Sequence, residues 1–372
     1  MSDPLQGIPT GRLYEAQVAA LARIHLFVTG EIHERMVEFT REARAILIRY
    51  AGREGQFDGA SGYRAQSEIM KAWGDTQAET LRLTMAGMKA AERLPFALLA
   101  EEHQRRVRPV AQRFQERSGN PVFEGWVQLQ LRLLLDQAQT RVLDGLNLSG
   151  RIWRNDREAR DGINGLIIKA IADKQDAWSL AKDLEQYLGA SQDCPRWTSN
   201  RLYNLSKKDI AEGDLVGLVT GRQCDGQGVA YKALRVARTE IQAIHDAATT
   251  AQLAASPWVL KERIVLSEGH PEPDICDDVA GGGEGGKGIY PVGDVTLPLH
   301  PNCLCYKVAV TMSDDEFAKQ LRGWVRGESE WPEMDAYSRN ISGGAGADLS
   351  QDAQLFGLLL FGAEQVLRKV IQ

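Results

Sequence analysis

The sequence predicts an α+β protein that is predominantly helical, with a helical N-terminal domain followed by a mixed core in which short strands surround a Cys/His cluster. Up to residue 146, apolar residues recur at three- and four-residue steps, which is the period of amphipathic helices. Runs of β-branched residues between turn formers occur only after residue 258, on either side of the cluster. We therefore expect three parts: a helical domain at 1–146, a mixed core at 147–312 and a helical tail at 313–372.

The N-terminal domain should consist of long helices. The first is expected at residues 13–50, with a break near Thr29-Gly30. Residues 51–63 contain four glycines and are expected to form a loop.

Helical patterning returns at residues 66–107, where Pro95 should end or kink the helix because proline lacks the N–H donor of that turn. A further helix is expected at 123–146. The chain also has a local basic patch, which we interpret as a solvated helix face, with weak DNA contact as the alternative. This patch comprises Arg105, Arg106, Arg108, Arg113 and Arg117.

Three helices are expected in the core, at 163–172, 176–188 and 231–253. The last of them carries Arg235, Arg238 and Glu240. No nucleophile, acid–base partner or cofactor loop adjoins Glu240, so packing and ion pairing are favoured over catalysis. The stretch 190–229 is rich in turn formers, and its Cys194 and Cys224 are expected to be structural or exposed.

Strands are expected on both sides of the Cys/His cluster, at 258–260, 263–266 and 305–310. In the tail, Ser313 and Glu316 have the spacing of a capping box at the start of a helix over 313–324. A Gly/Ser-rich linker at 341–347 then precedes an apolar helix at 352–370, which should fold back or dock on a partner.

Composition indicates an ordinary globular chain. Its 372 residues are 43% hydrophobic and 25% charged, enough for a sizeable core and for two or more domains. The net charge of -6 argues against nucleic acid as a partner of the whole surface. No secretory signal or membrane-spanning run is visible, so we expect no membrane association and a cytoplasmic location by default.

The candidate site is a set of cysteines and histidines in two clusters separated by a glycine-rich loop. The first cluster contains His270 and Cys276, and the second contains His300, Cys303 and Cys305. Thiolates and imidazoles are the usual ligands of tetrahedral zinc. We expect four of these five residues to hold a structural zinc ion.

Two other interpretations of the cysteines stay open. They could be ordinary buried thiols, or Cys276 could form a disulfide with Cys303 or Cys305. Five cysteines without a secretory signal favour a reducing compartment and argue against a disulfide framework. Elsewhere, His25 and His33 lie eight residues apart and are expected at the core edge or in solvent rather than as a ligand pair.

The glycine-rich loop at 281–288 matches the G-x4-G-K spacing of a phosphate-binding loop. However, Gly288 stands where such a loop needs Ser or Thr, and no helix N-terminus is expected after Lys287. We therefore expect no nucleotide binding.

The order of motifs over residues 145–310 resembles the phage Mu F-like head morphogenesis (minor capsid) family. The resemblance is carried by Arg238-Thr-Glu240 on a helix, the segment from His270 to Cys276, and the terminal element 298–305, which reads Pro-Leu-His-Pro-Asn-Cys-Leu-Cys. The family's last motif more often has arginine where this chain has Leu304. The resemblance implies His270, Asp274, Cys276, His300, Cys303 and Cys305 as the core motif.

The resemblance implies a minor head protein of a tailed bacteriophage or prophage, located in the virion and, during assembly, in the host cytoplasm. Its partners would be the portal protein and other capsid components, and it would assist DNA packaging or ejection. The alternative is a zinc-dependent hydrolase or nuclease in which Asp274, Asp277 or Asp278 serves as base. Mu F-like domains also occur joined to toxin domains, but no separate domain of that kind is evident in this sequence.

Overall fold

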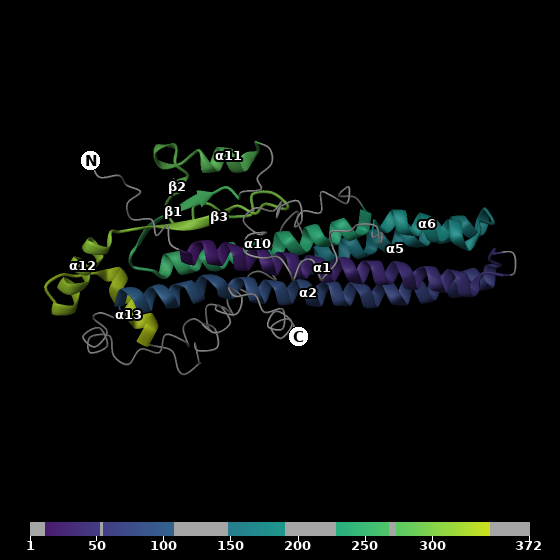
Figure 1. The fold of residues 1–372 in the computed structure, drawn as a ribbon, viewed down its shortest axis with the longest axis horizontal. Helices are drawn as coiled ribbons and strands as arrows, with labels where there is room; N and C mark the ends of the chain where they lie inside the picture. The colour runs from purple at the N-terminus through teal and green to yellow at the C-terminus, as the bar shows by residue number, and fades with distance from the viewer. Residues whose placement is uncertain (1–11, 53–54, 108–147, 190–227, 268–272, 343–372) are drawn as a thin grey trace.

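The computed structural model describes residues 12–52, 55–107, 148–189, 228–267 and 273–342 of the chain. An elongated helical bundle dominates these residues, and a small sheet lies against one side of the bundle near one end (Figure 1). The bundle helices are α1 (Arg12–Tyr50), α2 (Gly59–Val107), α5 (Leu148–Ala172), α6 (Ala177–Leu188) and α10 (Gly228–Ala255).

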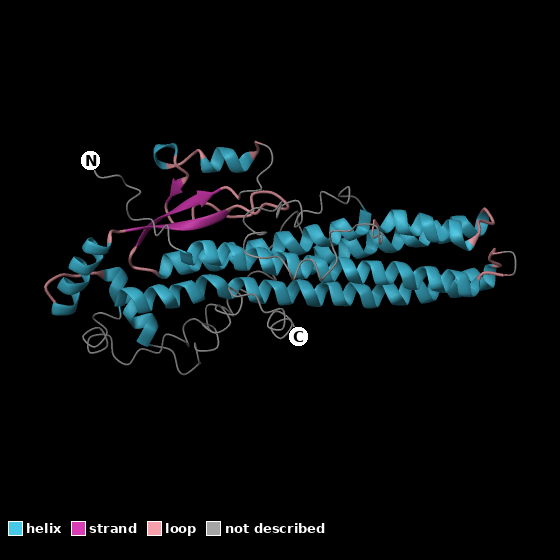
Figure 2. Cartoon of the chain, viewed as in Figure 1, coloured by secondary structure: helices cyan, strands magenta, loops and turns pink. Residues whose placement is uncertain are grey.

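The sheet has three antiparallel strands in the order β2-β1-β3 (Figure 2). Its strands are β1 (Val259–Val265), β2 (Ile289–Tyr290) and β3 (Tyr306–Thr311). Short helical segments α11 (Ile275–Ala280) and η3 (Glu284–Gly286) connect β1 to β2, and α12 (Asp314–Arg326) and α13 (Pro332–Ser342) follow β3. The described structure is thus mostly helical with a small sheet, which confirms the predicted α+β class.

Two large apolar cores run through the bundle. One lies at the sheet end and combines residues of α1, α2 and α10 with Trp258 and with aromatic residues of α12 and α13. The other combines residues of α1, α2, α5 and α6 with the start of α10. Both cores contain residues from either side of the boundary expected near residue 147, and the division into three domains stays a prediction.

The predicted break near Thr29-Gly30 is wrong, because α1 continues from Arg12 to Tyr50. Thr29 is fully buried, and its hydroxyl donates a hydrogen bond to the His25 carbonyl at 2.7 Å. Glycine and threonine disfavour a helix by at most about 1 kcal/mol each. Packing of this buried stretch against α2 and α10 outweighs that preference.

The start and the middle of α2 also differ from the prediction. The helix begins at Gly59, so only residues 51–58 form the connection, and it continues through Pro95 to Val107 rather than ending there; the kink expected as the alternative stays a prediction. Gly62 has a packing role, since a Cβ at this position would lie 2.4 Å from Ile171 Cδ1 of α5. Tertiary packing accounts for both differences, because Pro95 is buried within the helix and Gly62 faces a neighbouring helix.

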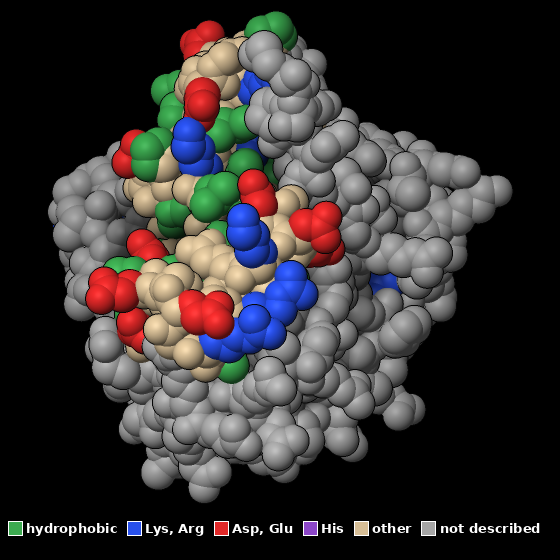
Figure 3. Space-filling view, turned by 90° about the vertical axis from the view of Figure 1, so that its left-hand side faces the viewer, with side chains coloured by type: hydrophobic (Ala, Val, Ile, Leu, Met, Phe, Trp, Pro, Cys, Tyr) green, Lys and Arg blue, Asp and Glu red, His purple; other side chains and the backbone are tan. Residues whose placement is uncertain are grey.

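The predicted bounds of the helix at 176–188 and the predicted capping box of α12 are confirmed, whereas the helix expected at 163–172 begins earlier, because α5 starts at Leu148. Asp176 caps α6, Gly189 ends it in the left-handed region at φ 63°, and Ser313 and Glu316 form the capping box of α12. Among the described helices none is long and apolar enough to cross a membrane. Among the described residues that Figure 3 shows, acidic and basic side chains are interspersed with hydrophobic ones.

Several predictions lie outside the described residues. These are the helices at 123–146 and 352–370, Cys194, Cys224, most of the linker, and the side chains of the basic patch.

Candidate metal centre

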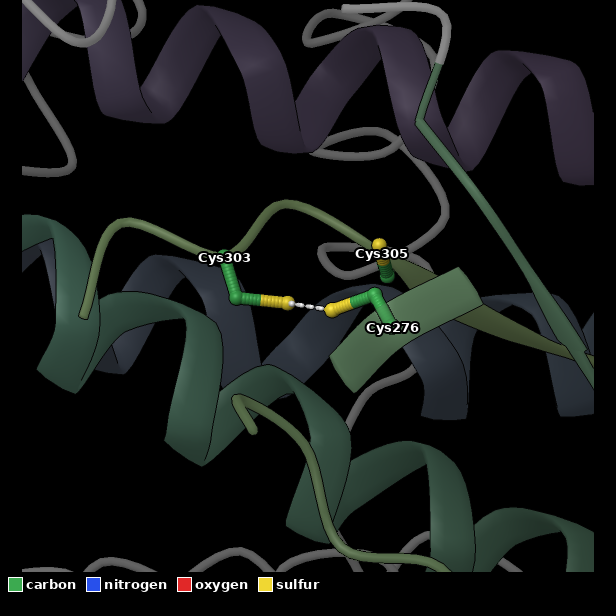
Figure 4. Close-up of side chains that lie close together, drawn as sticks. All are labelled: Cys276, Cys303 and Cys305. Carbon is green, nitrogen blue, oxygen red and sulfur yellow. Dashed lines mark hydrogen bonds between the residues drawn. The ribbon is translucent and has the colours of Figure 1, made fainter. Parts of the chain in front are cut away.

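Three buried cysteines from two distant segments meet beside the sheet. Cys276 lies in α11, whereas Cys303 and Cys305 lie in the loop that leads into β3. The three Sγ atoms all lie within 4.8 Å of one another, and Cys276 Sγ is 3.6 Å from Cys303 Sγ (Figure 4). Each residue is at most 2% exposed. Such a sulfur cluster could hold a metal ion.

The three cysteines differ in pKa, and Cys303 is the one favoured as a thiolate. Hydrogen bonds from the Cys305 thiol, and from backbone N–H groups, lower the pKa of Cys303 to about 5. Burial raises the pKa of Cys276, and the hydrogen bond to Cys303 raises that of Cys305. A bound cation would stabilise all three as thiolates, which is the form that ligates metals.

The capping of α11 positions Cys276. Asp274 is the N-cap, and its Oδ1 accepts a hydrogen bond from the Cys276 N–H at 2.6 Å. Asp277 completes the capping box by accepting from the Asp274 N–H at 2.8 Å. Two of the carboxylates considered as catalytic bases thus have a structural role at this helix end.

A second group of potential ligands shares Cys276. Atoms of Asp274, Cys276 and His300 also lie within 4.8 Å of one another. His300 Nδ1 lies 3.0 Å from the Pro301 carbonyl oxygen, a geometry that places the proton on Nδ1 and leaves the Nε2 lone pair available. This Nε2 is buried and forms no hydrogen bond to the described residues, although it lies 3.1 Å from Asp274 Oδ2. With the proton on Nδ1 alone, a cation beside Nε2 and the Asp274 carboxylate would stabilise their close approach; with both ring nitrogens protonated, Nε2 donates to Asp274 itself.

Helix α10 holds the loop that carries Cys303. Arg238 Nε donates to the side-chain oxygen of Asn302 at 2.8 Å, and Asn302 Nδ2 donates to the Tyr231 hydroxyl at 3.2 Å. Asn302 adopts the left-handed conformation, with φ 66°, which asparagine tolerates better than most residues. This arrangement, which we call the Asn302 clasp, fixes the turn immediately before Cys303.

A second contact from α10 fixes the other cysteine. Gln242 Nε2 donates to the Cys305 carbonyl at 2.9 Å, and Gln242 Oε1 lies 3.3 Å from His25 Nε2 of α1. All three residues are buried. The backbone of the cysteine loop is therefore linked through α10 to the first helix of the bundle.

Buried charges hold the strands to α10. The ammonium group of Lys307 on β3 lies 3.1 Å from Asp246 of α10 and 3.5 Å from Glu262 of β1, and it donates to Thr250 at 2.7 Å. The same carboxylates accept backbone N–H groups of the loop that follows β2, as in the 3.0 Å bond from Leu297 to Asp246. Every charged group of this network is at most 5% exposed, so mutual pairing offsets the cost of burial.

Glu240 has the ion-pair role expected for it. Its carboxylate accepts a hydrogen bond from Arg151 of α5, and both side chains are buried. Arg238 is also buried, but Arg235 is exposed, so the two arginines differ in environment despite their shared side of the helix.

The glycine-rich loop has a packing role in the structure. Gly288 has φ 67°, and a Cβ there would lie 2.7 Å from the Ala280 carbonyl oxygen and 3.0 Å from that of Ile264. Strand β2, which the sequence did not predict, follows directly, so Lys287 does not precede a helix N-terminus. The glycine accounts for the close approach of this loop to β1.

The structure thus brings together the three predicted cysteines and places His300 next to Cys276, while His270 lies outside the described residues. Sequence reasoning missed Gln242, the Asn302 clasp and the Lys307 network. A signal for the clasp was present, because an asparagine between Pro301 and Cys303 favours a tight turn. Nothing in the sequence identified which helix it would contact.

Comparisons of the chain with protein-family models, with curated proteins and with solved structures gave no match. The resemblance to the Mu F-like family therefore stays a prediction.

Proposed function

We propose that this chain is a minor head protein of a tailed bacteriophage or prophage, associated with the portal and other capsid components during head assembly and assisting DNA packaging or ejection. The role rests on the resemblance over residues 145–310. One observation supports it: two of the motifs that carry the resemblance are in contact, since Arg238 of α10 holds Asn302 beside Cys303.

The cysteine cluster would then hold a structural metal ion that joins α11 to the loop that leads into β3. We assign zinc to it, with Cys276, Cys303 and Cys305 as ligands. His300 lies close to Cys276 and Asp274 rather than to all three sulfurs, so its side chain would move toward them to take the fourth position. The donor set fits this metal because three thiolates with one imidazole make a common closed structural site. The burial of all three cysteines also suits a site from which water is excluded.

A zinc-dependent hydrolase or nuclease is the second candidate. It is favoured by the environment of His300, whose side chain is 32% exposed and lies beside Asp274 at the edge of the cluster. A catalytic zinc needs an open coordination position and a nearby base, and this edge is where both would lie.

Two measurements test the proposal. Mass spectrometry of purified virions, produced by the strain that encodes this chain, should detect the protein in the particle, and its absence would refute the head role. Elemental analysis of untagged protein should find about one zinc per chain. Hydrolysis of a nucleic acid or ester substrate that is lost in a His300→Ala variant would instead favour the second candidate.

A further inference from the structure

Exposed apolar side chains gather at the end of the bundle that is farthest from the sheet. This end contains the connections from α1 to α2 and from α5 to α6 (Figure 1). Of the seven large hydrophobic side chains that the described residues expose, four lie here: Ile48, Tyr63, Ile168 and Trp178. Such a concentration in one part of a surface is typical of an interaction site.

One face of this end is formed by α1 and α6, and we call it the Trp178 face. It comprises Arg44, Ile48, Trp178 and Lys182, all of which are exposed. Arg44 and Ile48 are one turn apart on α1, so they share a side of that helix. Trp178 and Lys182 have the same spacing on α6. The Arg44 guanidinium lies over the Trp178 ring, 4.4 Å from its centroid, and this stacking joins the two sides.

The chemistry of the Trp178 face defines the partner that it fits. Neither Arg44 nor Lys182 forms an ion pair with another described residue, so both charges are available to a partner. Tryptophan and arginine are enriched at the centres of protein interfaces. A fitting partner is therefore a short exposed segment that carries carboxylates and an apolar side chain between them.

The opposite end of the molecule carries a segment of this kind, the turn from α12 into α13 at residues 327–333 (Figure 1). It contains Glu328, Glu330 and Glu333 and no lysine or arginine, and all three carboxylates and Pro332 are exposed. Glu328 lies 3.9 Å from Arg326 of α12. Glu330 and Glu333 form no ion pair within the described part of the chain. Because the turn and the Trp178 face lie at opposite ends of an elongated molecule, one copy cannot join its own two surfaces.

We propose that the Trp178 face of one copy of this chain binds the 327–333 turn of a second copy. Pro332 lies against the Trp178 ring, and the two glutamates on either side of this proline pair with the two cations of the face. Charge complementarity selects this occupant, because two Trp178 faces would bring cations against cations. Such a contact is heterologous, so it builds a ring where the rotation closes and a filament where it does not. None of these residues belongs to the candidate metal centre, so the association is independent of the metal.

Sedimentation velocity of the whole chain tests the proposal over a concentration series at low and high salt. The monomer should convert to dimers and larger species as the concentration rises, with a dissociation constant in the micromolar range. Raising sodium chloride from about 0.05 M to about 0.5 M should shift the distribution toward the monomer, because salt screens exposed ion pairs.

Two variants, each defective in one surface, test the head-to-tail arrangement. Arg44→Glu in the face, and Glu330→Gln/Glu333→Gln in the turn, should each weaken association about tenfold or more. An equimolar mixture of the two variants contains one intact face and one intact turn, so it should form a 1:1 dimer that grows no further. Arg157→Glu is the matched control for charge reversal, since Arg157 is 67% exposed on α5 outside both surfaces, and it should associate as the wild type does.

Four outcomes would overturn the proposal. They are a wild-type chain that stays monomeric throughout the series, association that salt strengthens, equal effects of Arg44→Glu and Arg157→Glu, and a mixture of the two variants that yields no 1:1 dimer. Circular dichroism establishes that each variant is folded before it is sedimented. Association that is lost in the face variant and retained in the turn variant would show that the face binds another surface, and would also overturn it.

Discussion

The helical bundle and the sheet region that carries the cysteines are stabilised in different ways. The bundle has two extended apolar cores that contain fully buried aromatic residues such as Trp73, Phe39 and Trp258. The apolar cluster around the cysteines has six buried residues, and three of them are Cys276, Cys303 and Cys305 themselves. The bundle can therefore rely on hydrophobic burial, whereas the cysteine region needs specific polar contacts and, as we propose, a metal.

Helix α10 connects the two regions. One side contributes Ile241 and Ile244 to the apolar core, and another presents Arg238, Gln242 and Asp246 to the cysteine loop and the strands. A single helix thus supplies both packing and polar anchoring. This division predicts that the two regions respond differently to the same perturbation.

Metal removal should have the largest effect, and it should be confined to the cysteine region. Structural zinc contributes about 10–16 kcal/mol of apparent binding free energy at pH 7. We expect chelation to accelerate amide hydrogen exchange in residues 273–311 while α1 and α2 keep their protection. Hydrogen-exchange mass spectrometry with and without chelator measures this difference.

The matched control is a Cys303→Ser/Cys305→Ser variant, whose exchange should no longer respond to chelator. Unchanged amide exchange in β3 of the wild-type chain after chelation would contradict a stabilising role of the metal in this region. So would less than about a tenth of an equivalent of zinc in the purified protein.

Truncation of a bundle aromatic should have the next largest effect and should leave the metal centre intact. Trp73 is fully buried, packs edge-on against Phe39 at 5.1 Å between ring centroids, and donates to Asp156 at 2.7 Å. Trp73→Ala should lower the free energy of unfolding by about 3–5 kcal/mol. Urea denaturation measures this loss. Tyr63→Ala, at an aromatic that is 67% exposed, is the control and should have little effect. An equal loss in both variants would contradict the assignment of the bundle core.

Lowering the pH should reduce the free energy of unfolding through His25 and His245, which lie where the two regions meet. Burial lowers the pKa of His25 to about 4 and that of His245 to about 3, both below the ordinary value of 6.5. The folded state then binds fewer protons than the unfolded state in this window, so stability is lost as the pH falls from about 6.5 to 4. The loss should be on the order of 3 kcal/mol per histidine. The urea midpoint measured between pH 7 and pH 4 tests this expectation.

A His25→Gln/His245→Gln variant serves as the control for the pH dependence and should show a flatter profile. The variant must be compared with the wild type because Asp246 changes stability with pH in the opposite direction. Burial raises the pKa of Asp246 to about 6, so its contribution to stability is lost as the pH rises from about 4 to 6. Identical slopes in the variant and the wild type would exclude the histidines as the cause.

The smallest effect is expected at the exposed N-terminus of α12. The Ser313 hydroxyl accepts the Glu316 N–H at 3.3 Å, and the Glu316 carboxylate accepts the Ser313 N–H at 3.1 Å. Ser313→Ala should cost about 1 kcal/mol. Ser313→Asp, which restores an N-cap acceptor, should recover most of that loss in thermal unfolding. A loss as large as that of Trp73→Ala would show that Ser313 does more than cap the helix.

The sequence by itself determined the helical class, the approximate positions of β1 and β3, the α12 capping box and the set of cysteines in the candidate site. These features depend on local periodicity and on the chemistry of neighbouring residues, which can be recognised without a fold. The tertiary structure decided the continuity of α1 through Thr29-Gly30 and of α2 through Pro95, because burial against other helices outweighs local preference. It also decided the long-range partners, since Arg151 pairs with Glu240 and Arg238 with Asn302 across 89 and 64 residues of chain. Such contacts depend on which surfaces meet in three dimensions, and no local pattern specifies that.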